Sequence, residues 1–249
     1  MRFIFLDEYK RDDKYFEING DDYRHLIANR YQPKDMIKAK YGDYIGNFVI
    51  CKISSTYLFG EFFPEKKIEN PEHYISLILG LPKDRALFPT LEKSAEIGIK
   101  DIFITPTVNS DRKDINETKF ERMKKIVKES CMQSGNYFIP CINYFNSLSI
   151  ILEKIKDDYT LKLLLDEGYI ENINPFDIYS KYCIENFSRV VIFVGPEGGI
   201  NENEKNNLIK SGFISISLGS NILRTETAAI GTIFFLKQLQ NFIYKRSFF

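Results

Sequence analysis

The chain has 249 residues and a mass of 29.1 kDa, and 44% of its residues are hydrophobic. This composition suffices for one large globular domain or two domains of ordinary size, and it excludes a disordered chain. The 34 basic residues are balanced by 34 acidic residues, which excludes a protein that coats nucleic acid through bulk positive charge. Local patches would have to contact any polyanionic partner.

The first 70 or so residues predict short strands separated by turns. β-branched and aromatic residues concentrate in four segments, at residues 2–6, 15–18, 44–53 and 56–63. A single helix is expected over residues 21–29, with Asp21 or Asp22 as its cap. We therefore expect a small β-barrel domain over residues 1–70, followed by a polar, proline-bracketed linker at residues 64–71.

From residue 73 onward, to residue 249, the pattern changes to strand, loop and helix. Helical spacing is seen at residues 87–97 and 119–133. The apolar runs that predict buried strands are residues 74–79, 101–105, 161–165, 189–195 and 213–218. This alternation predicts an α/β domain over residues 73–249, with a parallel sheet covered by helices on both faces.

The apolar runs at the two ends of the chain are short. Four apolar residues precede the first charge after Arg2, and residues 228–236 are about half of the ~20 residues that span a bilayer. We expect a cytoplasmic protein with reduced thiols. Its four cysteines and two histidines show no metal-binding spacing, so we expect neither a zinc cluster nor a disulfide framework. We expect the cysteines to be small buried residues without a chemical role; they are Cys51, Cys131, Cys141 and Cys183.

One glycine-rich loop follows the apolar strand at residues 190–194 and reads Gly195-Pro196-Glu197-Gly198-Gly199. Glycines let a backbone approach a ligand closely, and α/β folds bind ligands at the carboxyl ends of strands. A helix follows, with Asn201 as N-cap and Glu204 completing a capping box. The loop is neither a dinucleotide fingerprint nor a P-loop, which disfavours a pyrophosphate cofactor. From these residues alone, a ligand loop and an ordinary strand-to-helix turn both remain open.

A second loop, at residues 217–224, also joins a strand to a helix. Arg224 and Glu226 flank Thr225 where the first N–H groups of the helix are free. Taken alone, this segment favours an Arg-Glu surface pair with a threonine cap.

Together, the two loops resemble the signature of the bacterial 16S ribosomal RNA uridine-N3 methyltransferases of the SPOUT superfamily. The resemblance is carried by residues 195–199 and by residues 218–228, and it extends upstream in the family's order. Asn136 stands where the family usually has arginine, which puts one RNA contact in doubt, and Asp111 replaces the usual glutamate. The upstream segments that carry the likeness are Leu81-Pro82-Lys83, residues 92–98, Ser110-Asp111-Arg112, Glu121-Arg122, Gln133-Ser134-Gly135, Ile139-Pro140, His25-Leu26, Arg30 and Gly42-Asp43.

The resemblance implies a SPOUT-type fold with a C-terminal trefoil knot, a PUA-like RNA-binding barrel before it, and a homodimer with the knot at its interface. It also implies S-adenosyl-L-methionine as the methyl donor and no metal. Glycines would admit the donor, and apolar side chains would contact its adenine. The residues expected to bind it are Leu165, Gly195, Pro196, Glu197, Gly198, Gly199, Leu218, Gly219, Ile222, Leu223, Thr227 and Ala228, of which Leu165 is also readable as a core leucine.

For catalysis, we expect Arg224 to stabilise negative charge on the uracil carbonyls and Glu226 to orient the base or accept the N3 proton. The substrate would be 16S ribosomal RNA in the small subunit. Two basic segments, residues 24–40 and 112–128, would contact its phosphates, although each is also readable as a solvated helix face. The expected RNA-binding residues are Arg24, His25, Arg30, Arg112, Arg122 and Gln133.

Two other functions remain open. One is a SPOUT methyltransferase of ribose 2′-hydroxyls, and the other is an RNA-binding assembly factor without catalysis. The order of the motifs and the N-terminal barrel favour the uridine-N3 enzyme, and the intact loops argue against a factor that has lost its activity.

Overall fold

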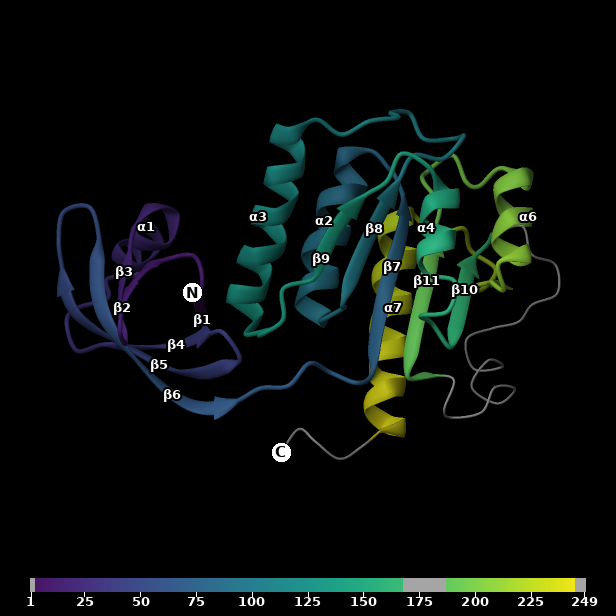
Figure 1. Cartoon of the computed structure of the whole chain (residues 1–249). Helices are drawn as coiled ribbons and strands as arrows, with labels where there is room; N and C mark the ends of the chain where they lie inside the picture. The colour runs from purple at the N-terminus through teal and green to yellow at the C-terminus, as the bar shows by residue number, and fades with distance from the viewer. Residues whose placement is uncertain (1–2, 168–186, 245–249) are drawn as a thin grey trace. The chain divides into compact units, whose positions relative to one another are not determined.

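A computed structural model describes residues 3–167 and 187–244 of the chain (Figure 1). It divides into two compact units. The first comprises Met1–Asn70 together with Glu129–Tyr137, and the second comprises Pro71–Lys128 and Phe138–Phe249. The end of one long helix, α3 (Glu117–Ser134), therefore belongs with the first unit, which a division at the linker does not anticipate.

The first unit is built on a six-stranded sheet in the order β1-β4-β5-β6-β3-β2. The pair β1·β4 is parallel, and the other neighbours are antiparallel. Phe16 and Phe48 are buried because alternate residues of β3 and β5 turn toward the core, whereas all three residues of β1, Phe3 among them, are buried. The elements are β1 (Phe3–Phe5), β2 (Lys10–Asp12), β3 (Tyr15–Ile18), α1 (Gly20–Ala28), β4 (Met36–Tyr41), β5 (Tyr44–Ile53) and β6 (Leu58–Lys67).

Two local predictions for this unit are wrong. Strand β6 continues to Lys67, so the first half of the expected linker is paired strand. Pro64 is tolerated there because it lies opposite Gly46, at a register shift of the β5·β6 pair, and a Cβ on Gly46 would stand 2.0 Å from the Phe63 carbonyl oxygen. The N-cap position of helix α1 is Asn19, whose side chain makes no capping hydrogen bond, while Asp21 and Asp22 lie in the first turn.

The second unit contains a six-stranded, wholly parallel sheet in the order β12-β10-β11-β7-β8-β9. The expected α/β class with a parallel sheet is therefore confirmed. Two short elements were not predicted, β9 and α4, because four and seven residues are too few to show a period. The elements besides α3 are β7 (Tyr74–Gly80), α2 (Asp84–Ile97), β8 (Asp101–Thr105), β9 (Cys141–Tyr144), α4 (Leu148–Lys154), β10 (Leu161–Leu165), β11 (Arg189–Val194), α6 (Glu202–Lys210), β12 (Ile214–Ile216) and α7 (Thr225–Ile243).

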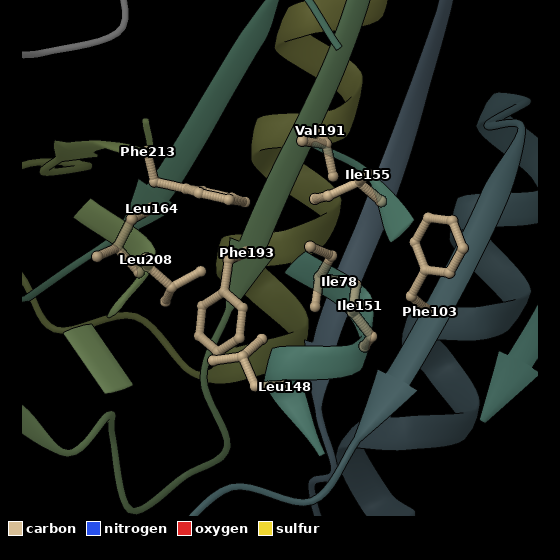
Figure 2. Packing of buried hydrophobic residues seen from close by; sticks show 10 residues of the cluster. All are labelled: Ile78, Phe103, Leu148, Ile151, Ile155, Leu164, Val191, Phe193, Leu208 and Phe213. Atoms are coloured by element: carbon tan, nitrogen blue, oxygen red, sulfur yellow. The ribbon is translucent and has the colours of Figure 1, made fainter. Parts of the chain in front are cut away.

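A row of apolar residues crosses this sheet and packs under α4 and α6 (Figure 2). Ile78 is in register with both Phe103 and Phe193, and Phe193 with Leu164, so the four side chains point to one face. Helix α7 contacts β7, β11 and α2, and Figure 1 shows it behind the sheet, opposite α4. Because all six strands run parallel, their carboxyl ends lie at one edge of the sheet, and the loops of interest leave from that edge.

Candidate active site

Two loops meet at the carboxyl edge of the parallel sheet. The first, residues 195–201, follows β11, and the second, residues 217–224, follows β12 and leads into α7. The Thr225 Oγ1 hydroxyl donates a hydrogen bond of 3.2 Å to the Gly195 carbonyl oxygen. Thr225 is buried, and its hydroxyl ties the start of α7 to the first loop rather than capping its own helix. Segments separated by thirty residues therefore meet at this edge of the sheet.

Close backbone approaches explain the glycines of the first loop. A Cβ on Gly198 would lie 3.0 Å from the Asn109 carbonyl oxygen, and Gly199 has a left-handed φ of +71°. Gly80, at the end of β7, packs against the same loop, because a Cβ there would lie 2.8 Å from Pro196 Cδ. Gly195, Gly198 and Gly199 thus allow the loop to fold back on itself at the sheet edge. The capping box expected at Asn201 and Glu204 is present and starts α6 directly after it.

Contacts with two other segments of the chain hold the glycine loop in place. The Asn109 amide donates from Nδ2 to the carbonyl oxygens of Gly198, at 2.9 Å, and Gly199, at 3.4 Å. The Glu197 carboxylate accepts from the Lys83 backbone N–H at 3.1 Å, at the start of α2. It also lies 3.8 Å from Arg85 Nε. The side chain of Glu197 is therefore engaged with the start of α2.

The second loop exposes apolar surface beside an open glycine. Gly219 has a φ of +120°, and no heavy atom of the described residues lies within 4 Å of the place that its Cβ would occupy. Its backbone N–H donates to Ser217 Oγ at 3.4 Å, which fixes the turn. Ile222 is 77% exposed and Leu223 is 39% exposed. Such exposure of two neighbouring large aliphatic residues is typical of surface that a ligand or a partner covers.

Arg224 and Glu226 bracket the start of α7. Arg224 is the exposed N-cap residue, and Glu226 lies half-buried in the first turn. Among residues 3–167 and 187–244, neither side chain makes an ion pair or a hydrogen bond, so the Arg-Glu surface pair does not form.

The other expected binding residues border these loops. Leu165 ends β10 and is half-buried, and the following Asp166 pairs with Lys205 at 2.5 Å. Leu218 is half-buried in the second loop. On α7, Thr227 is exposed and Ala228 is buried. Glu167, which was not predicted, places Oε1 at 3.6 Å from the position of a Cβ on Gly199.

Asn109 and Glu167 were missed because neither belongs to a motif. Both follow strands of the parallel sheet, Asn109 after β8 and Glu167 after β10. A position just after the carboxyl end of a parallel strand was the one feature of the sequence that could have marked them as candidate site residues. A survey of polar residues after each predicted strand would have included them.

In the first unit, the expected RNA-binding residues lie on the surface. Arg24 and His25 are exposed on α1, where Arg24 pairs with Asp21. Arg30 is exposed just after α1, in a left-handed conformation with φ +61°. Gln133 is exposed in the last turn of α3.

In the second unit, the expected RNA-binding arginines have partners already. Arg112 lies 3.5 Å from the Asp84 carboxylate, which Lys119 also contacts at 2.6 Å. Lys119 lowers the pKa of the Asp84 carboxyl, so that the carboxylate form persists. The Arg122 guanidinium stacks 4.2 Å from the centre of the Phe88 ring. Part of the positive charge of this segment is therefore neutralised locally.

The described cysteines are less uniform than expected. Cys51 and Cys141 are exposed, which corrects their assignment as buried residues, whereas Cys131 is buried. Burial raises the pKa of the Cys131 thiol to about 12. Cys183 lies outside the described residues. Over the described ranges, no group of three His, Cys, Asp or Glu side chains could hold a metal ion, and no helix is long and apolar enough to cross a bilayer.

Comparison with known proteins places this geometry in a family. A model of the RNA methyltransferase domain matches residues 69–237. The ribosomal RNA small subunit methyltransferase E of Mesomycoplasma hyopneumoniae is 29% identical over 91% of this chain and 95% of its own. The protein of that name from Buchnera aphidicola subsp. Acyrthosiphon pisum is 30% identical over 88% of this chain and 86% of its own.

The fold is shared with a solved structure over almost the whole length. The crystal structure of a ribosomal RNA small subunit methyltransferase E from Neisseria gonorrhoeae, bound to S-adenosyl methionine, superposes with a TM-score of 0.79. It covers 96% of this chain and 98% of its own, at 24% identity. The chain therefore belongs to the ribosomal RNA small subunit methyltransferase E family of RNA methyltransferases.

Proposed function

We propose that this protein transfers a methyl group from S-adenosylmethionine to N3 of a uridine in 16S ribosomal RNA of the small subunit. The observation that carries the proposal is the junction of the two loops, made by the Thr225–Gly195 hydrogen bond at the carboxyl edge of the sheet. The names of the relatives support small-subunit ribosomal RNA as the substrate, and the bound ligand of the Neisseria protein supports the methyl donor.

The residues of the two loops fit S-adenosylmethionine. Open space beside Gly219 adjoins the exposed side chains of Ile222 and Leu223, which suits the flat, weakly polar adenine ring. When bound, the cofactor supplies an electrophilic methyl group on a sulfonium centre. The residues that would hold it are Leu165, Gly195, Pro196, the main chain of Glu197, Gly198, Gly199, Leu218, Gly219, Ile222, Leu223, Thr227 and Ala228, with Glu167 within reach of Gly199.

Arg224 and Glu226 would act on the base. N3 of neutral uridine carries a proton, and its lone pair is available only as that proton leaves. The unpaired guanidinium of Arg224 donates hydrogen bonds to the uracil carbonyl oxygens and stabilises the negative charge that develops there. Glu226 orients the base or accepts the N3 proton. Holding N3 in line with the methyl group supplies the remainder of the rate.

We infer the domain architecture of the protein from that of the family. Residues 1–70 would form a PUA-like RNA-binding domain that uses Arg24, His25 and Arg30, and residues 73–249 a SPOUT domain whose C-terminal loops are knotted. Arg112, Arg122 and Gln133 would add RNA contacts. A homodimer that buries α7 is supported by two large apolar residues exposed on that helix, Phe234 at 55% and Phe242 at 59%.

The test is methyl transfer to small subunits isolated from cells that lack this protein, followed by mass mapping of the modified nucleoside. We expect one methyl group on a uracil base. A methyl group on a ribose 2′-oxygen would favour the alternative SPOUT reaction. Calorimetric titration with S-adenosylmethionine separates an enzyme from a non-catalytic assembly factor, since the latter would not bind the donor.

A further inference from the structure

A large groove in the second unit lies apart from the two loops. It has a volume of about 1110 Å³ and runs between α4 and α6, with the loop after β8 at one end. Figure 1 shows both helices beside the strands that carry the site. None of the residues expected to bind cofactor or to catalyse methyl transfer lines this groove, so it needs a different occupant.

Positive charge converges on the groove from four separate segments. Its lining includes Lys113, Lys156, Lys162 and Lys210, against Glu153 and Glu204 as the acids. The Glu204 carboxylate is already used, because it accepts hydrogen bonds from the backbone N–H groups of Val108, at 2.9 Å, and Asn201, at 3.3 Å. Over the described ranges, no ion pair involves any of the four lysines.

Two of these ammonium groups are held in place by the main chain. Lys113 Nζ donates to the carbonyl oxygens of Thr107, at 2.6 Å, and Val108, at 2.7 Å. Lys162 Nζ donates to those of Lys156, at 2.8 Å, and Ser211, at 3.4 Å. An ammonium group has three N–H donors, so each of these lysines retains one for a ligand. Carbonyl oxygens orient the charge without neutralising it.

The remaining lining suits a phosphate-bearing chain. Hydroxyl and amide groups of Ser147, Ser149 and Asn207 can donate to phosphate oxygens, as such side chains commonly do in nucleic-acid complexes. Leu148 and Leu152 add apolar surface for the face of a sugar or a base. The volume slightly exceeds the usual range of a small-molecule pocket, ~300–1,000 Å³, and suits a segment of a polymer better than a single metabolite.

The groove also connects to the proposed reaction site. Glu204 lines it and bonds to Val108, and the next residue, Asn109, holds the carbonyl oxygens of Gly198 and Gly199. We propose that the groove between α4 and α6 binds the phosphodiester backbone of a single-stranded RNA segment outside the methylated nucleotide. The choice of RNA over an acidic peptide rests on the proposed function, because RNA is the polyanion that this activity brings to the protein.

The test measures the affinity of the full-length protein for a short oligouridylate at several salt concentrations. We expect the charge reversals Lys156→Glu and Lys210→Glu each to weaken binding about fivefold at ~0.15 M salt and to lower the slope of log K against log [salt] by about one. Lys154→Glu is the matched control. This residue also lies on the surface of α4 but is not in the groove lining, and it should change the affinity by less than about twofold.

Equal losses in all three variants, or no loss at Lys156 and Lys210, would overturn the proposal. UMP should bind far more weakly than the oligouridylate. Equal affinities would indicate a mononucleotide pocket, and a preference for an acidic peptide would indicate a protein partner. Either result would contradict the proposal. Photocrosslinking of the unmodified protein to oligouridylate that contains 4-thiouridine should label peptides within residues 146–156 or 204–212, and labelling only elsewhere contradicts the proposal even if a variant misfolds.

The two proposals fail independently. Unmodified protein that methylates ribosomal RNA but shows no groove-dependent RNA affinity would refute the groove alone. Protein that binds oligouridylate through the groove but transfers no methyl group would refute the proposed function alone.

Discussion

The Thr225 hydroxyl and the Gly195 carbonyl oxygen are 3.2 Å apart, and the hydrogen bond between them joins the helix after one loop to the start of the other. Thr225→Val keeps the shape of the side chain but removes the donor and leaves the Gly195 carbonyl without this partner. We expect a loss of about 1 kcal/mol in the free energy of unfolding and about tenfold weaker binding of S-adenosylmethionine, measured by denaturant titration and calorimetry.

Thr225→Ser is the control for that experiment, because it keeps the hydroxyl and should retain most of the affinity. If Thr225→Val binds the cofactor as the unmodified protein does, the junction of the two loops is not needed for the site.

Asn109 is expected to position the glycine loop. Asn109→Ala removes both hydrogen bonds to Gly198 and Gly199, and Asn109→Asp turns a carboxylate toward two carbonyl oxygens. Cofactor affinity should fall about tenfold in the first variant and further in the second, while Val108→Ala, at an exposed neighbouring side chain, should leave it unchanged. Cofactor affinity in both variants equal to that of the unmodified protein would show that the amide does not orient this loop.

Arg224 should affect the rate more than the binding of the cofactor. Its side chain is exposed and makes no ion pair or hydrogen bond with the described part of the chain, so Arg224→Ala should leave the fold and the cofactor affinity unchanged. Single-turnover methylation should slow by about 10²-fold, the usual effect of removing one donor to a developing oxyanion. Arg224→Lys should recover part of that rate, since it restores the charge but not the two-pronged geometry. An undiminished rate in Arg224→Ala would remove this residue from the mechanism.

Thiol chemistry should follow burial. The pKa of Cys131 is raised to about 12 by burial, so almost none of it is thiolate at pH 8. Iodoacetamide should therefore modify Cys51 and Cys141 and spare Cys131 in the folded protein, as peptide mapping would show. Modification of Cys131 at the rate of Cys51 would mean that this part of α3 opens readily.

The sequence predicted the elements whose pattern is local. Five of the six strands of the parallel sheet and both glycine-containing loops were found, because an apolar run followed by glycine is visible over ten residues. The contacts that hold these loops were not predicted, because Asn109 lies about 90 residues away from Gly198 in the chain and no local pattern links the two residues. Pro64 was assigned to a linker for a similar reason: its tolerance in β6 depends on Gly46 in the opposite strand.

The methyltransferase reaction could be predicted only from the two loops taken together. Arg224 and Glu226 alone favoured a surface ion pair, and only the resemblance of both loops to one family indicated a methyltransferase. The absence of that ion pair among the described residues is a tertiary result that spacing along a helix could not supply.

A crystal structure of the protein with S-adenosylmethionine tests the central claim most directly. The account predicts the adenine beside Gly219, Ile222 and Leu223, with its polar atoms bonded to main-chain groups and the methyl group facing the Arg224 side. Density for the cofactor in the groove between α4 and α6, or a complex in which residues 195–199 and 217–224 make no contact with it, would contradict the account.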